Sequence, residues 1–142
     1  MTETSAEFGP FRAACAAIVE GGAAALRWQW DDYVGAALAP FPVDDAPATH
    51  ALVSTHFAHR FGPDTIAGAP PPIRAIAESF GGLRAGQELF ASEPNDGVTL
   101  FGCWWPWGGG DRVSLRIGLG RPAASEADEA RLHAALRAWF SL

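Results

Sequence analysis

Three histidines in the middle of the chain are the side chains whose spacing first suggests metal binding or catalysis. His56 and His59 are three residues apart, which on a helix can bring two imidazoles to one metal ion. The zinc-protease helix instead has histidines four residues apart with a glutamate between them, and this stretch lacks that set. We therefore expect a polar helix flank and no bound metal. For His50, a buried ring bonded to a backbone carbonyl is the main prediction, and a binding group or general base is the alternative.

Adjacent carboxylates and a glycine-rich turn are two further patterns that could carry chemistry. Asp31 and Asp32 are neighbours, and consecutive side chains on a helix diverge, so no shared acid–base pair is expected. The stretch Gly118-Leu-Gly120-Arg-Pro-Ala123 imitates the phosphate-binding turn of dinucleotide folds, but no second parallel strand is found to complete that unit. All ten basic residues are arginine, which excludes Schiff-base lysine chemistry and phosphate loops that end in lysine. We expect no cofactor.

The two cysteines lie in apolar surroundings. Cys15 is flanked by alanines, and Cys103 lies between Phe-Gly and Trp-Trp. Such neighbours favour a neutral thiol packed in the core, whereas a disulfide or a nucleophile would need spacing or context that the sequence does not supply. We expect both thiols to be structural.

Charge and hydropathy exclude two classes of partner. The chain has a net charge of −6, and its arginines are scattered, so no basic stripe is available to neutralise nucleic-acid phosphates. The longest uncharged apolar stretch, Val98–Trp107, is too short to span a bilayer. The opening MTETSAEFGP lacks a basic segment followed by an apolar one, so a cytoplasmic location is expected. The lysine-free composition, rich in alanine and arginine, is typical of a bacterial chain.

The pattern of apolar residues predicts an α+β fold with helices first and a sheet second. We expect residues 1–142 to form a single two-layer domain, with a flexible segment over residues 1–9. The sheet is predicted to be a three-stranded antiparallel meander over 87–91, 98–107 and 112–119. Helices are predicted from Pro10 to Gly21, over 26–38, from a cap at Asp44 or Asp45 to Phe61, over 70–80, and after the N-cap Ser125.

Six tryptophans are the least ordinary feature of the composition. Trp104, Trp105 and Trp107 occur together on the expected middle strand, where alternation sends Cys103, Trp105 and Trp107 to one face and Trp104 to the other. Simple packing over a small sheet is the main interpretation, and an exposed interaction surface is the functional one. The residues we single out for ligand or partner binding are Trp28, Trp30, Trp104, Trp105, Trp107, Arg112, Arg116 and His50.

These patterns favour a binding or regulatory protein over an enzyme. We expect a tryptophan- and arginine-rich surface that engages a protein partner or a second copy of the chain as a homodimer. The alternative is a cofactor-free small-molecule binder, sensor or enzyme, with an apolar pocket lined by Trp30, Trp105 and Trp107 and a polar group such as His50 or Asp32.

Overall fold

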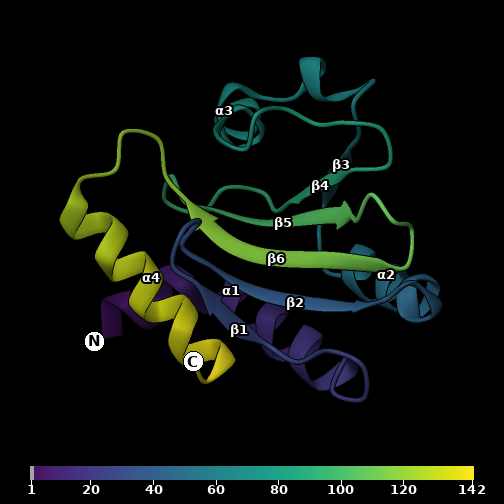
Figure 1. Ribbon diagram of the computed structural model, residues 1–142. Coiled ribbons are helices and arrows are strands. Elements are labelled where there is room, and N and C mark those ends of the chain that lie inside the picture. Colours follow the sequence, from purple (N-terminus) through teal and green to yellow (C-terminus); the bar gives the residue numbers. More distant parts are fainter. Residues whose placement is uncertain (1) are drawn as a thin grey trace.

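A six-stranded antiparallel sheet forms the centre of the protein (Figure 1). The computed structural model describes residues 2–142, with side chains from Phe8 onward. The strands are β1 Gln29–Asp31, β2 Ala36–Pro42, β3 His59–Phe61, β4 Glu88–Ala91, β5 Thr99–Pro106 and β6 Arg112–Gly120. They lie in the order β1-β2-β6-β5-β4-β3, so the two three-residue strands form the edges of the sheet.

Four α-helices connect and cover the strands within residues 2–142. They are α1 Thr2–Gly21, α2 Ala46–Thr55, α3 Pro71–Ser79 and α4 Glu126–Phe140, and short 3-10 turns occupy Val43–Asp45 and Ile66–Gly68. None of the helices in this part of the chain is long and apolar enough to cross a membrane. The segment 1–9, for which we predicted flexibility, belongs to α1 from Thr2 onward, and Met1 lies outside the described residues.

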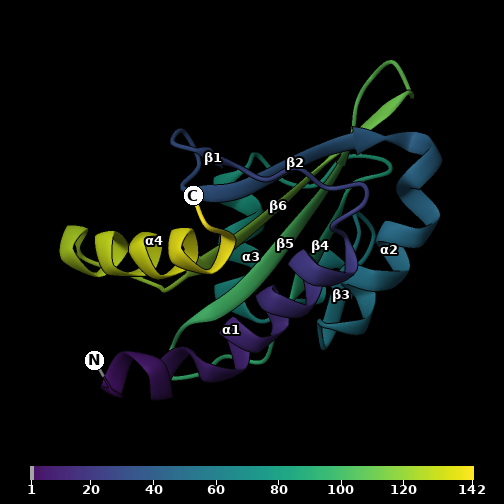
Figure 2. The ribbon, with the colours of Figure 1, turned by 90° about the horizontal axis from the view of Figure 1, so that it is seen from below.

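Side chains alternate across the strands and bury two separate clusters. On one face, Phe90, Leu100 and Trp104 belong to a large core that also contains residues of α1, α2 and α4. On the opposite face, Leu89 and Phe101 belong to a smaller cluster beneath α3. Figure 2 shows α1 and α4 next to one another, and both helices contribute to the large core. Helices therefore lie on both faces, and the expected two-layer arrangement is wrong.

The predicted three-stranded meander is also wrong, although the α+β class holds. β4, β5 and β6 form it, but three further strands extend the sheet. The segment 26–38, predicted as a helix, folds into β1, a tight turn and part of β2. In that turn, Asp31 Oδ1 accepts hydrogen bonds from the backbone N–H groups of Tyr33 (3.0 Å) and Val34 (3.3 Å). Pairing with β6 then outweighs the high helix propensity of alanine, because tertiary contacts override local propensity.

Of two other predicted helices, one is shorter than expected and one is present as expected. The helix expected to reach Phe61 stops at Thr55, and residues 59–61 pair with β4 as an edge strand. The closing helix is present, and the Ser125 Oγ accepts a hydrogen bond from the backbone N–H of Asp128 at 3.1 Å, as a capping residue does. Local capping signals thus located α4, whereas β3 depends on a partner far away in the sequence.

Two prolines lie in β2 without breaking the sheet. β1 pairs with β2 only through Leu38, so the outer edge of β2 has no partner strand from Ala39 onward. Pro40 and Pro42 fall in this stretch, and β6 pairs with the other side of the strand. A missing N–H on an unpaired edge costs no ladder hydrogen bond.

Gly118 allows the Phe101 ring to lie across β6. A Cβ at Gly118 would lie 2.4 Å from the ring, so we expect Gly118→Ala to lower the free energy of unfolding by about 1–3 kcal/mol. The matched variant Gly120→Ala, where the nearest atom is Ile76 Cδ1 at 3.3 Å, should cost less than about 1 kcal/mol. Urea unfolding of both variants measures the difference, and equal effects would contradict this packing.

Candidate functional site

The half of the sheet not covered by α3 carries Trp107, the exposed tryptophan that directly follows β5. The buried strand residues beneath α3 come from β4 and β5, whereas the side chains of β2 and β6 on this face are mostly partly exposed. We call this surface the open face. The strand pairing places on it Asp31, Leu38, Pro40, Trp105, Arg112, Ser114 and Arg116. Trp107 joins them because its backbone N–H donates a hydrogen bond to the Arg112 carbonyl at 2.9 Å.

Trp107 is held in place although it is 47% exposed. Its indole Nε1 donates a hydrogen bond to the Ser114 Oγ at 2.8 Å. The guanidinium carbon of Arg112 lies 5.5 Å from the centre of the ring, within cation–π range. Trp105 is half-buried, and its ring meets Phe80 of the α3 region edge-on at 5.7 Å. Both indoles of this face therefore have fixed partners, and Trp107 is the more exposed of the two.

The two arginines of the open face differ in their partners. Arg116 Nε donates to Asp31 Oδ2 at 3.0 Å, and the two side chains are 24% and 14% exposed. This pair links β6 to β1 across β2. Among residues 8–142, no carboxylate lies within 4 Å of the Arg112 guanidinium. Arg112 is therefore the cation of this face that lacks an acidic partner.

The remaining tryptophans singled out from the sequence lie on the opposite side of the sheet. Trp104 is 6% exposed, and its ring lies 5.5 Å from that of Phe41. Trp28 and Trp30 pack against the large core. The structure therefore separates Trp30 from Trp105 and Trp107 by the thickness of the sheet and does not bring the three together around one pocket.

His50 is bonded to side chains and not to the backbone carbonyl that we expected. Its Nε2 lies 3.0 and 3.1 Å from the two carboxylate oxygens of Glu88, and its Nδ1 lies 3.3 Å from the Ser54 Oγ. Glu88 also contacts Arg60 Nε at 3.5 Å, and the imidazole meets the Trp104 ring edge-on at 4.9 Å. The serine, imidazole and carboxylate stand in the order of a nucleophilic triad. Their contacts tie α2 to β4, which is the role we assign to them.

Sequence reasoning missed Ser54 and Glu88 as partners of His50. Ser54 lies four residues after His50 on α2, a spacing that brings side chains together on a helix. Glu88 comes from β4, and only the folded sheet brings it to the imidazole.

His56 and His59 do not share a helix, because α2 ends at Thr55. His59 lies on β3, where its Nε2 contacts a carboxylate oxygen of Glu93. Within the described residues, no group of three histidine, cysteine or acidic side chains is placed to hold a metal ion. The three-residue spacing therefore has no metal-binding geometry here.

Both cysteines are fully buried free thiols. Burial raises the pKa of Cys15 to about 12. For Cys103, burial raises the thiol pKa further, and the positive charge of Arg116 offsets only part of that effect. A buried neutral thiol is a poor nucleophile, because the thiolate is the reactive form.

We predict that neither thiol of the folded protein reacts with Ellman's reagent at pH 8, since Cys15 ionises only near pH 12 and Cys103 is buried. Unfolding in guanidinium chloride should release both equivalents. Absorbance at each condition gives the count. Rapid release of one equivalent by the folded protein would show that a thiol is accessible.

Removal of Trp104 should lower the free energy of unfolding far more than removal of Trp107. Trp104→Ala empties a core position that is 6% exposed and should lower the free energy of unfolding by about 3–5 kcal/mol. Trp107→Ala removes a ring that is 47% exposed and should cost only about 1 kcal/mol. Chemical unfolding followed by circular dichroism measures both. Unfolding of the chain by Trp107→Ala would show that this ring is part of the core.

No family model, curated protein or solved structure matches the chain. A function for it therefore has to come from the chemistry of its own residues, and the open face is the surface where that chemistry is most developed.

Proposed function

We propose that the protein is a cytoplasmic binding protein whose open face docks a segment of another protein. That segment carries an acidic residue next to an apolar one. The observation that carries this proposal is Trp107, which is 47% exposed and stacked on Arg112. Tryptophan and arginine are the residues most enriched among those that dominate binding energy at protein interfaces.

The apolar part of the face supports contact with a side chain of the partner. Leu38 and Pro40 lie partly exposed on β2, next to Arg116 and Ser114 of β6. Trp107 already has its indole N–H bonded and its ring stacked, so little rotamer freedom remains to be lost on binding. A preordered surface of this kind binds with a smaller entropic penalty.

The charges of the face support a carboxylate as the polar half of the motif. Arg116 is already paired with Asp31, whereas Arg112 has no carboxylate within 4 Å among residues 8–142. A guanidinium can take a carboxylate in a two-point contact. Because the chain as a whole carries a charge of −6, this attraction acts at short range and favours a local acidic group over a strongly acidic partner.

Selection from a random peptide library on the immobilised protein tests this chemistry. We expect the enriched peptides to share an aspartate or glutamate next to an aromatic or aliphatic residue. Trp107→Ser and Arg112→Gln should each weaken binding of those peptides by about 10-fold or more, measured by fluorescence polarisation. Tyr33→Ser is the matched control, since Tyr33 is 98% exposed and lies in the β1–β2 turn, beyond the opposite end of β2 from Arg112. It should bind as the parent does.

Two results would overturn the proposal. Enriched peptides without acidic residues, or peptides that bind Trp107→Ser as tightly as the parent, would remove the open face as the recognition surface. A dimer of the purified chain in sedimentation equilibrium, dissociated by Trp107→Ser and not by Tyr33→Ser, would show that the occupant is a second copy and not another protein.

A further inference from the structure

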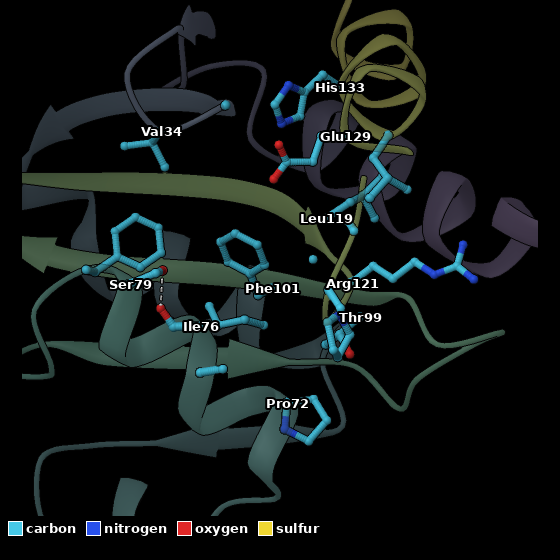
Figure 3. A pocket seen from close by; sticks show the side chains of 18 residues that line it. Val34, Pro72, Ile76, Ser79, Thr99, Phe101, Leu119, Arg121, Glu129 and His133 are labelled. Atoms are coloured by element: carbon cyan, nitrogen blue, oxygen red, sulfur yellow. Dashed lines mark hydrogen bonds between the residues drawn. The ribbon is translucent and has the colours of Figure 1, made fainter. Parts of the chain in front are cut away.

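A cavity of about 340 Å³ lies away from the open face, between α3 and α4 (Figure 3). The β1–β2 turn, the start of β5 and the end of β6 also line it, and it is open to solvent. Its volume falls at the small end of the range for small-molecule sites in proteins. None of the residues singled out for ligand or partner binding lines it, although Leu119 to Ala123 of the glycine-rich turn do. Phe80, which lines the cavity, also contacts Trp105 of the open face.

The cavity has an apolar, partly aromatic wall. Phe101 and Leu119 come from the central strands, and Phe80 and Ile76 come from α3 and its C-terminal end. The rings of Phe80 and Phe101 meet edge-on at 6.0 Å. This wall can cover the apolar body of a ligand, and the faces of the aromatic rings attract positive charge.

Two polar side chains of α4 stand on the opposite side of the cavity. Figure 3 shows the Glu129 carboxylate and the His133 ring next to one another, facing the side where Phe101 and Ile76 lie. They are four residues apart on the helix, so they project from the same face. Glu129 is exposed and His133 is partly buried, and Ser79, Thr99 and Arg121 are the other polar residues that line the cavity.

The imidazole of His133 is fixed by its surroundings. Gly35 of the β1–β2 turn has a φ of +77°, and a Cβ there would lie 2.5 Å from His133 Nε2. On another side, the ring meets Trp30 edge-on at 5.6 Å. The close approach of the turn backbone therefore needs a glycine, and it keeps the imidazole at the cavity.

The charge that faces the cavity is negative. Among residues 8–142, no cationic side chain lies within 4 Å of the Glu129 carboxylate. Arg121 also lines the cavity, but Figure 3 shows its side chain running away from the other labelled residues. A carboxylate without a cation, set opposite aromatic rings, is the arrangement that binds an ammonium group on an apolar body.

We propose that this cavity binds a small organic cation, a protonated amine on a compact apolar body. The ammonium group bonds to Glu129, and the body lies against Phe101, Phe80 and Leu119. The His133 ring adds a polar contact beside the carboxylate. The size of the cavity limits the ligand to small molecules and excludes a folded partner.

Three probes of nearly equal shape and different charge test the assignment by isothermal titration calorimetry. They are 2-phenylethylamine as the cation, 2-phenylethanol as its neutral counterpart and 3-phenylpropanoate as the anion. We expect the amine to bind at least about 10-fold more tightly than the alcohol, since a hydrogen bond to a charged group is worth that factor, and the anion not to bind. Chemical shifts of α3 and α4 amides should report the amine at the cavity.

Variants of α4 and α3 locate the effect. Glu129→Gln should reduce amine affinity to that of the alcohol, whereas Glu126→Gln, a change of the same charge in the first turn of the same helix and outside the cavity lining, should leave it unchanged. Ala75→Phe, which adds a ring from an exposed lining position of α3, should abolish binding of every probe.

Several outcomes would overturn the assignment. No binding of the amine, or equal binding of amine and alcohol, would exclude a cation site. Tighter binding of the anion would also exclude it and would indicate that Arg121 binds the ligand. If Glu129→Gln and Glu126→Gln lowered amine affinity equally, the amine would be responding to the overall negative charge of α4 and not to a bond with Glu129. Thermal unfolding of each variant confirms that binding is measured on folded protein.

Discussion

The pairing of β2 with β6 is the constraint on which the rest of the structure depends. On one side of this ladder, Leu38 and Pro40 stand next to Arg116 and Ser114 and form the apolar half of the open face. On the other side, alanines of β2 are fully buried beneath the helices. Their small side chains let α4 approach the sheet closely, which in turn brings Glu129 and the rest of its face to the cavity.

The parts of the fold that depend on local signals could be predicted, and those that depend on distant pairing could not. Ser125 marked the start of α4, and alternation marked β6. Between 26 and 38 the apolar residues recur every four positions, which fits one face of a helix and also every second position on one face of a strand. Only β6, more than seventy residues later, decides between the two. The same argument explains why β3 was missed.

Among the candidate site residues, too, positions set by local alternation could be predicted and positions set by distant elements could not. Alternation along β5 correctly sent Trp104 and Trp105 to opposite clusters. The position of Trp30 was inferred from a helix, whereas the residue lies on β1, so the expected pocket with Trp105 and Trp107 does not form. The partners of His50 and the lining of the cavity come from elements far apart in the sequence, and no spacing rule brings a strand residue such as Glu88 to a helix.

The short edges of the sheet have a consequence for how this molecule meets others. β1 and β3 each offer three residues to an incoming strand. The longer free edge of β2 contains Pro40 and Pro42, whose nitrogens carry no hydrogen to donate. Short edge strands and edge prolines are features that disfavour growth of a sheet from molecule to molecule, as in fibrils. The edges of this sheet therefore offer a neighbouring molecule only short stretches of free backbone N–H groups.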